Sequence, residues 1–222
     1  MSMAASAYVR IATMIERGDL DPGAVLTEAS LMAAADTGRT PLREALQRLL
    51  RERWLEAGTG RGLRVPPISL DDQLARLEVR RPLEVLAVEL AAVRADARQL
   101  AAVGEHMRAL ADVRDHEDYL SALARSHELI RGLANNDHLA DALQPLQGLS
   151  RRFWLATTRD RQDEVEIGRS LYTPALGAVV RQDAAGAREA ILLLHDHLAD
   201  SALDWARRRA EQARFLPPSP RV

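Results

Sequence analysis

The chain has 222 residues, which is enough for two domains of roughly 70 and 150 residues. With a net charge of -2, 47% hydrophobic and 28% charged residues, it has the composition of a globular protein rather than a disordered one. The absence of cysteine excludes disulfides, thiolate chemistry and a cysteine zinc site. No run approaches the roughly 20 apolar residues that span a bilayer, and residues 1–10 lack a signal-peptide core, so we expect a cytoplasmic protein with no membrane partner.

The first predicted element is a helix over residues 4–17. Its expected core contacts are Tyr8, Val9, Ile11 and Ile15. Gly18 ends this helix, and Pro22 with Gly23 forms a turn. Residues 25–26 are expected to supply a short strand that pairs with a hairpin further along the chain.

Two helical segments follow, over residues 26–36 and 38–50. In the second, GRTPLREALQRLL, apolar residues recur at helical spacing and predict a buried stripe of Leu42, Ala45, Leu46, Leu49 and Leu50. We expect the Thr40 hydroxyl to cap this helix and Pro41 to occupy its first position, where no N–H is missed.

The opposite face of the same helix carries Arg39, Arg43 and Gln47, which are four residues apart and therefore lie in one row. Arginine can bond guanine, and glutamine can bond adenine, through two hydrogen bonds in the major groove. The row also fits the solvated face of an ordinary amphipathic helix, and the helix alone leaves both interpretations open.

The next segments favour the DNA-reading interpretation. Residues 54–57 and 62–65 are extended candidates on either side of a glycine-rich turn with an arginine at its tip, which predicts a hairpin. Helix, tight turn, helix and two-stranded wing is the order of a winged helix-turn-helix. From residue 39 to residue 64, seven arginines (39, 43, 48, 51, 53, 61 and 64) outnumber three glutamates (44, 52 and 56). Such a basic surplus on a nearly neutral chain is typical of a phosphate-contact surface.

The rest of the chain is predicted to be helical throughout. Helices are expected at 70–94, 96–113, 117–134, 137–158, 162–181 and 184–213, with aspartate or asparagine at the breaks. The predicted fold class is mainly α, an N-terminal winged helix-turn-helix followed by an all-α antiparallel helical bundle. We place the domains at 1–66 and 71–214, with a linker over 67–70 and a flexible tail over 215–222.

Residues 8–66 resemble the DNA-binding domain of GntR-family bacterial transcription regulators. The resemblance is carried by residues 15–23 (IERGDLDPG), 26–28 (LTE), 39–46 (RTPLREAL) and 60–65 (GRGLRV). With the row described above, it gives these candidate DNA contacts: Arg39, Thr40, Arg43, Gln47, Arg48, Gly60, Arg61 and Gly62. One departure is Gly38, where many members place a serine or threonine that anchors a phosphate.

Residues 71–205 are similar to the FCD ligand-binding domain of the FadR-like GntR subgroup. The matching pieces are residues 78–84 (EVRRPLE), His127 followed by Asn136 and Leu139, and the last helix. In that subgroup an aspartate and three histidines point into the bundle, bind a divalent metal and help to hold a small carboxylate effector. The resemblance therefore implies an effector site inside the bundle.

The metal pattern of that subgroup is incomplete in this chain. Its aspartate and its second and third histidines fall on Leu123, Tyr172 and Leu194. His127 fits the first histidine, whereas His195 and His197 are close to the third but out of register, and only one of these two can face inward. Zinc or a similar ion needs three or four converging ligands, so no cofactor is assigned, and His127, His195 and His197 stay as candidate ligands.

A metal-free effector pocket is the favoured expectation for the bundle. Its candidate residues are Arg80, Leu123, His127, Asn136, Tyr172, His195 and His197. Arg80 can receive a carboxylate through a bidentate pair. A structural ion pair between Arg80 and Glu84 fits the sequence equally well.

The two modules together predict a sequence-specific DNA-binding transcription regulator, a repressor rather than an activator, controlled by a small-molecule effector. The resemblance implies a homodimer on pseudo-palindromic, double-stranded operator DNA. One alternative is an effector-independent DNA-binding protein whose bundle only dimerises. The other, a metal-dependent hydrolase, is disfavoured because the chain shows neither a complete ligand set nor a nucleophile–base pair. We therefore expect no enzyme.

Overall fold

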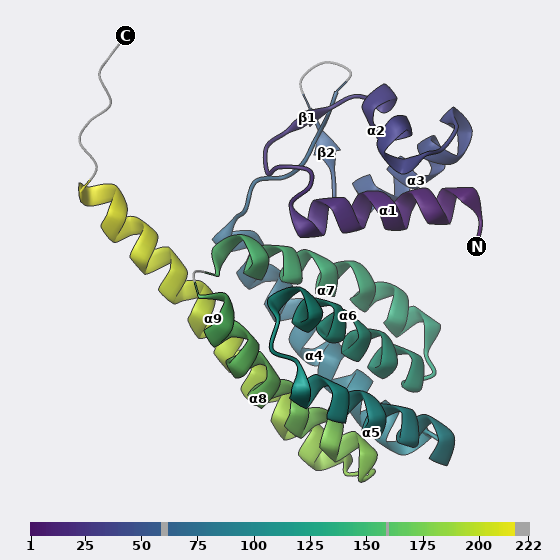
Figure 1. Cartoon of the computed structure of the whole chain (residues 1–222), viewed down its shortest axis with the longest axis vertical. Coiled ribbons are helices and arrows are strands. Elements are labelled where there is room, and N and C mark those ends of the chain that lie inside the picture. The colour runs from purple at the N-terminus through teal and green to yellow at the C-terminus, as the bar shows by residue number, and fades with distance from the viewer. Residues whose placement is uncertain (59–61, 159, 216–222) are drawn as a thin grey trace. The chain divides into compact units, whose positions relative to one another are not determined.

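The computed structural model describes residues 1–58, 62–158 and 160–215, and these are mainly helical (Figure 1). The elements in chain order are α1 (Met3–Arg17), β1 (Val25–Leu26), α2 (Glu28–Ala35), α3 (Arg39–Arg51), β2 (Glu56–Ala57), β3 (Leu63–Arg64), α4 (Leu70–Arg94), α5 (Ala97–Asp112), α6 (His116–Leu133), α7 (Asp137–Thr157), α8 (Arg161–Val180) and α9 (Ala184–Phe215). This confirms the predicted fold class. No helix in the described part of the chain is both long and apolar enough to cross a membrane.

The chain packs as two compact units. The first contains residues 1–69 together with 141–158, and the second contains residues 70–140 and the described residues from 160 onward. Helix α7 therefore begins in the second unit and contributes most of its length to the first. The linker at 67–70 stays a prediction. The tail at 215–222 also stays a prediction, because residues 216–222 lie outside the described residues.

The first unit is a winged helix-turn-helix (Figure 1). Helix α1 packs on α3, and α2 packs on both of them. The small sheet has the order β1-β3-β2, with Leu26 opposite Leu63 in one antiparallel pair and Ala57 opposite Leu63 in the other. The predicted hairpin and the predicted strand at residues 25–26 are therefore confirmed, although Trp54 and Leu55 enter the core instead of the sheet.

The beginning of α3 differs from the prediction. The helix starts at Arg39 with Gly38 as its N-cap, and no side chain caps it. Thr40 and Pro41 are thus the second and third helical residues, so the expected Thr40 cap and the expected place of Pro41 are wrong. The helix can start early because Pro41 still lies in the first turn, where backbone N–H groups have no partner within the helix.

Two residues expected in the core are exposed. Val9 on α1 and Leu50 on α3 both face solvent. The other predicted core residues of these two helices are buried, and on α1 the core also includes Ala7 and Ala12. The confirmed residues are Tyr8, Ile11 and Ile15 on α1 and Leu42, Ala45, Leu46 and Leu49 on α3. The prediction placed too wide an arc of each helix in the core.

The C-terminal part of α7 is built into the first unit. Leu149 joins the apolar core that contains Trp54, and a Cβ added at Gly148 would lie 2.6 Å from Trp54 Cη2. Arg151 donates to both carboxylate oxygens of Glu16 on α1, at 2.6 and 2.9 Å. This segment therefore belongs to the packing of the first unit, although the sequence groups it with the bundle.

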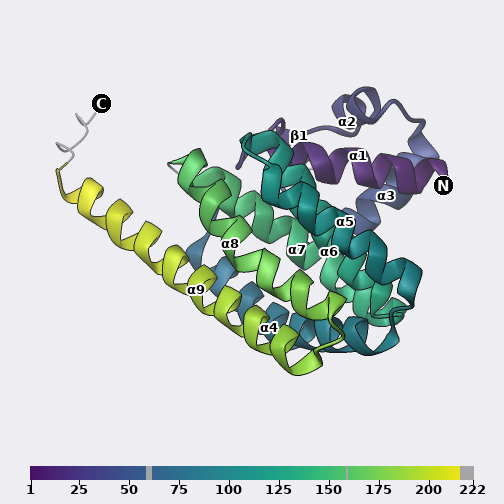
Figure 2. The same cartoon turned by 60° about the horizontal axis from the view of Figure 1, so that its bottom comes forward.

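The second unit is a helical bundle centred on α4. Helices α4 and α9 lie side by side (Figure 2). They are antiparallel, because Arg81 pairs with Asp196 at 2.5 Å while Glu89, further along α4, pairs with the earlier Arg188 at 3.1 Å. Helices α8, α6 and α5 complete the core.

The helix boundaries of the bundle agree with the prediction to within two residues. The reason is local, since the side chains of Asp96, Asp115 and Asp160 accept hydrogen bonds from the first free amides of α5, α6 and α8.

We predict that Gly148→Ala destabilises the first unit by about 1–3 kcal/mol, because the added methyl group overlaps the Trp54 ring. Gly132→Ala is the matched control, since a Cβ at that helical glycine has open space and should be neutral or slightly stabilising. Urea unfolding followed by tryptophan fluorescence measures both. Equal stability of the two variants would contradict the packing described for α7.

Candidate DNA interface and effector site

The sequence-predicted row on α3 faces solvent. Arg39, Thr40, Arg43 and Gln47 are all exposed, whereas the opposite side of the helix is buried in the core of the first unit. Arg43 Nε donates to Glu28 Oε2, 3.3 Å away on α2. Because this pair is exposed, it is worth less than about 1 kcal/mol and holds the guanidinium only loosely.

Arg48 does not belong to this row, although it was a candidate DNA contact. Its Nε donates to Glu52 Oε1 at 2.7 Å, and its guanidinium carbon lies 3.9 Å from the centre of the Tyr8 ring. Nη2 donates to Gln144 Oε1 at 3.3 Å. Arg48 follows Gln47 by one residue, which rotates its side chain by about 100° about the helix axis and places it against Tyr8 of α1 and Gln144 of α7.

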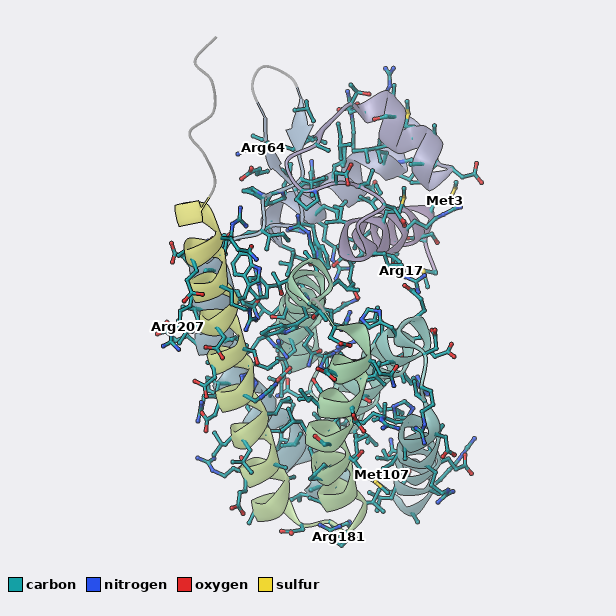
Figure 3. All side chains as sticks on the ribbon, turned by 60° about the vertical axis from the view of Figure 1, so that its left-hand side comes forward. Met3, Arg17, Arg64, Met107, Arg181 and Arg207 are labelled. Atoms are coloured by element: carbon teal, nitrogen blue, oxygen red, sulfur yellow. The ribbon has the colours of Figure 1, made fainter. Side chains whose placement is uncertain are left out.

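The wing is closed next to its tip. The Gly58 N–H donates to the Gly62 carbonyl oxygen at 3.0 Å, which brings the two sides of the turn together. Gly60 and Arg61 lie outside the described residues, so of the predicted wing contacts only Gly62 is described. Arg64 on β3 is labelled in Figure 3. Its Nη2 pairs with Glu56 Oε1 on β2 at 2.5 Å.

Five polar side chains from four helices lie buried in the second unit, each at most 9% exposed, and we call them the buried polar cluster. They are Arg80 and Glu84 on α4, His127 on α6, Tyr172 on α8 and His195 on α9. Arg80 donates from Nε at 3.3 Å and from Nη2 at 2.8 Å to Glu84 Oε1. The other carboxylate oxygen, Oε2, lies 2.6 Å from His195 Nε2.

The remaining contacts join the cluster into one network. A hydrogen bond links His127 Nε2 to the Tyr172 hydroxyl, and Tyr172 also interacts with Arg80. Because an ionised carboxylate only accepts, His195 Nε2 carries a hydrogen and donates it to Glu84 Oε2. Within the described residues the buried His195 Nδ1 has no hydrogen-bond partner.

The network keeps its acid and its base charged. Burial alone would raise the pKa of Glu84, but Arg80, His195 and His127 together hold it well below the usual range. Burial alone would also lower the pKa of Arg80, and the neighbouring Glu84 and Tyr172 raise it instead. The cluster is therefore an ionised pair in an apolar core, which is stable only while both partners are present.

The structure brings together most of the predicted effector residues. Arg80, His127, Tyr172 and His195 meet in the cluster, and the buried Leu123 lies in the same core as Tyr172. The sequence left two partners open for Arg80, an effector carboxylate and Glu84. In the structure Arg80 forms the ion pair with Glu84. Glu84 was not among the predicted site residues, and its spacing of four from Arg80 is the signal that could have identified it.

Asn136 and His197 are placed differently from the prediction. The Asn136 side chain accepts from the Leu139 N–H at 3.2 Å and so caps the start of α7. His197 is only partly buried and bonds to Ser201 Oγ at 3.2 Å. As predicted from their spacing, only one of His195 and His197 faces inward.

The residues present do not fit the divalent metal that the resemblance to the FCD domain implies. Among the described residues, no group of three or more histidine and carboxylate side chains is arranged to hold a metal. His127 is hydrogen bonded to Tyr172 and His195 to Glu84, and Leu123 offers no ligand atom. His127, His195 and His197 therefore do not form a common ligand set, and we assign no chemistry to a metal here.

Each of the two units contains a segment that matches a known protein family. Residues 3–65 match the family of bacterial regulatory proteins, gntR family, and residues 75–200 match the FCD domain. The HTH-type transcriptional regulator YdhC of Bacillus subtilis is 27% identical over 146 residues. That match covers 64% of this chain and 65% of the relative, so it spans just under two thirds of the relative's length.

Solved structures share the fold. McbR/YncC from E. coli has a TM-score of 0.79 at 21% identity, covering 92% of this chain and 98% of its own. A GntR transcriptional regulator from Rhodococcus sp. RHA1 has a TM-score of 0.68 at 22% identity, covering 93% and 98% of the two chains. With a winged helix-turn-helix that matches gntR and a bundle that matches FCD, the chain belongs to the GntR family of transcription regulators, in the FadR-like group that carries an FCD domain.

Proposed function

We propose that this regulator is a homodimeric repressor that reads a pseudo-palindromic operator in the cytoplasm and responds to a small carboxylate at the buried polar cluster. The observation that carries the proposal is the exposed row Arg39, Thr40, Arg43 and Gln47 on a helix whose other face is buried. A rigid helix with such a row suits the major groove, where two half-sites of an operator meet two copies of α3.

The start of α3 supports phosphate binding beside the base contacts. No side chain caps this helix, so the N–H groups of its first residues face outward without a capping oxygen. Helix N-termini favour anions because these N–H groups and the helix dipole point at the ligand. This arrangement offsets the missing serine or threonine at Gly38, since the backbone itself provides donors. Arg61 and the two glycines beside it at the wing tip are proposed as minor-groove or phosphate contacts.

The buried polar cluster supports carboxylate binding because it already holds one carboxylate, that of Glu84. In this proposal an effector acid shares or takes over the guanidinium of Arg80, which forms strong paired hydrogen bonds with carboxylates. The buried His195 Nδ1, which has no hydrogen-bond partner among the described residues, would form a hydrogen bond with a polar group of the same effector. Tyr172 and His127 provide the remaining polar side chains of this proposed effector site.

Helix α7 offers a route from effector to operator. Helix α6, which carries His127, leads directly into α7, and residues 141–158 of α7 belong to the packing of the DNA-binding unit. A shift of α6 on effector binding would therefore act on Leu149 and the Arg151–Glu16 pair, in addition to the linker at 67–70. Coupling of this kind is typically about 1–3 kcal/mol.

One observation favours a second candidate function, an effector-independent dimeric DNA-binding protein. Arg80 and Glu84 satisfy each other inside the core, as a purely structural ion pair would. The metal-dependent hydrolase considered from the sequence gains no comparable support, since the described residues contain no group of three or more histidine and carboxylate side chains arranged to hold a metal. The effector experiment below separates the two DNA-binding candidates.

We predict that Arg43→Ala weakens operator binding by about 1–3 kcal/mol and relaxes sequence preference, because a bidentate base contact is lost. Arg17→Ala on α1 removes the same charge away from the row and should leave the preference intact. Fluorescence anisotropy with operator and scrambled duplexes at one fixed salt concentration measures both. An unchanged preference in Arg43→Ala would remove α3 from the role of reader.

We predict that a small mono- or dicarboxylic acid raises the melting temperature and changes operator affinity by about 5- to 150-fold. Tyr172→Phe, which removes one hydroxyl from the cluster, should weaken this response while leaving effector-free operator binding unchanged. Thermal-shift screening followed by mobility-shift titration tests both expectations. If no acid in a broad panel alters either quantity, the effector-independent function is the correct one.

We predict that Glu84→Gln lowers the free energy of unfolding by about 3 kcal/mol or more, because the buried Arg80 loses its counter-charge. Since folding lowers the pKa of Glu84, its stabilising contribution is present above its unfolded value of 4.5 and is lost as the pH falls through the folded value. The stabilities of wild type and variant should therefore converge on acidification. Urea denaturation at a series of pH values measures this, and a constant difference would contradict the ionised pair.

A further inference from the structure

Helix α9 continues well past the part of it that is built into the bundle. Among its described side chains the last buried one is Ala202, and none from residue 203 to residue 212 is buried. We call residues 203–212 the α9 extension. Figures 1 and 2 both show this end of α9, coloured yellow, extending away from α4 and α8.

The α9 extension has no apolar face of its own that is packed. Helices in proteins owe most of their stability to the packing of such a face, and isolated helices shorter than about 12–15 residues are marginal in water. A helical stretch without this packing therefore suits a role in contacting a partner. Leu203, 37% exposed, lies at its start, and residues 207–212 (RRRAEQ) that follow are exposed and mostly charged or polar. The partner that fits is held by charge rather than by an apolar groove.

The charge of this end of the chain is opposite to that of the bundle. Residues 70–203 contain 22 acidic residues and 16 arginines, a balance of -6 with histidine neutral. Residues 204–222 contain five arginines and two acidic residues, a balance of +3. A basic segment on an otherwise acidic part of a chain attracts polyanions, and basic terminal segments commonly bind nucleic acid.

The arginines of the α9 extension are available to a ligand. Arg207 donates from Nη1 to Asp204 Oδ1 at 3.1 Å, but their side chains are 74% and 53% exposed, so the pair is weak and a phosphate can replace it. The guanidinium carbon of Arg209 lies 5.3 Å from the centre of the Trp205 ring, a contact that does not use a carboxylate. Arg208, between them, is exposed. Guanidinium groups form strong paired hydrogen bonds with phosphates.

We propose that the α9 extension is a second DNA-contacting surface of this regulator, which binds phosphates of duplex DNA through Arg207, Arg208 and Arg209 without reading bases. Duplex DNA is the polyanion that a winged helix-turn-helix already brings to the molecule. The base-reading row on α3 provides sequence preference, and the α9 extension adds affinity for any duplex. The proposal requires neither the repressor role nor the effector proposed above.

The first test measures binding of the full chain to a scrambled duplex by fluorescence anisotropy at a series of salt concentrations. The variant combines Arg207→Gln, Arg208→Gln and Arg209→Gln. The slope of log K against log salt concentration should become shallower by about 1–3, because each phosphate contact contributes about 0.9 to it. Arginines near the end of a helix also interact favourably with its dipole, so circular dichroism is used to compare the helicity of variant and wild type.

The matched control removes the same charge elsewhere in the second unit, at three exposed arginines, by combining Arg98→Gln, Arg108→Gln and Arg125→Gln. This control should leave the slope close to that of the wild type. Equal slopes in the two triple variants, or an unchanged slope in the α9 variant, would overturn the proposal. The preference for operator over scrambled duplex should survive in the α9 variant and depends on Arg43 instead, so failure of the base-reading function is distinguishable.

The second test locates the contact and does not depend on the helicity of the triple variant. The chain has no cysteine, so Gln212→Cys and Ala102→Cys each provide a single thiol, at exposed positions on α9 and α5, for a photo-crosslinking label. Duplex DNA should crosslink to the label at position 212 several-fold more than to the label at position 102. Equal crosslinking at the two positions would refute a specific contact by the α9 extension.

Discussion

The burial of one side of α3 is the constraint on which the rest of the first unit depends. Leu42, Leu46 and Leu49 are inaccessible to solvent or nearly so, and α1 packs against the helix that carries them. Burying three leucines is worth several kcal/mol, which fixes the rotation of the helix about its axis. Arg39 and Arg43 project outward as a consequence and need no support from contacts of their own. A base-reading surface built this way is positioned by its apolar side, and its charged side can remain available for a ligand.

The buried polar cluster is held in place by charge pairing and hydrogen bonds, whereas α3 is positioned by the burial of apolar side chains. A guanidinium and a carboxylate in an apolar core each lose their hydration, and that cost is offset only by their mutual pairing and by further hydrogen bonds. Glu84 receives such bonds from Arg80 and from His195, and Tyr172 connects Arg80 to His127. In the FCD pattern a metal ion would supply positive charge in this part of the bundle. Here Arg80 is the fixed cation, which agrees with the replacement of the acidic ligand position by Leu123.

Local chemistry made much of this protein predictable from its sequence. Aspartates that cap helices, such as Asp96 and Asp160, act within one turn of the chain, so the helix boundaries of the bundle were correct to within two residues. The hairpin and the row on α3 are likewise short-range patterns, in which glycine placement and four-residue spacing carry the information. The narrower extent of each apolar face was not predicted, because the exposure of Val9 and Leu50 depends on how close the neighbouring helices come.

The sequence by itself determined which segments are helices, which face of α3 is charged and that a polar group of residues belongs inside the bundle. Only the tertiary structure decided which of those residues meet, because Glu84 and His195 are brought together by α4 and α9 from distant parts of the chain. It also assigned Asn136 to a helix cap, and it placed residues 141–158 in the packing of the DNA-binding unit. Those outcomes depend on the burial of one element against another, which no periodicity along a single helix contains.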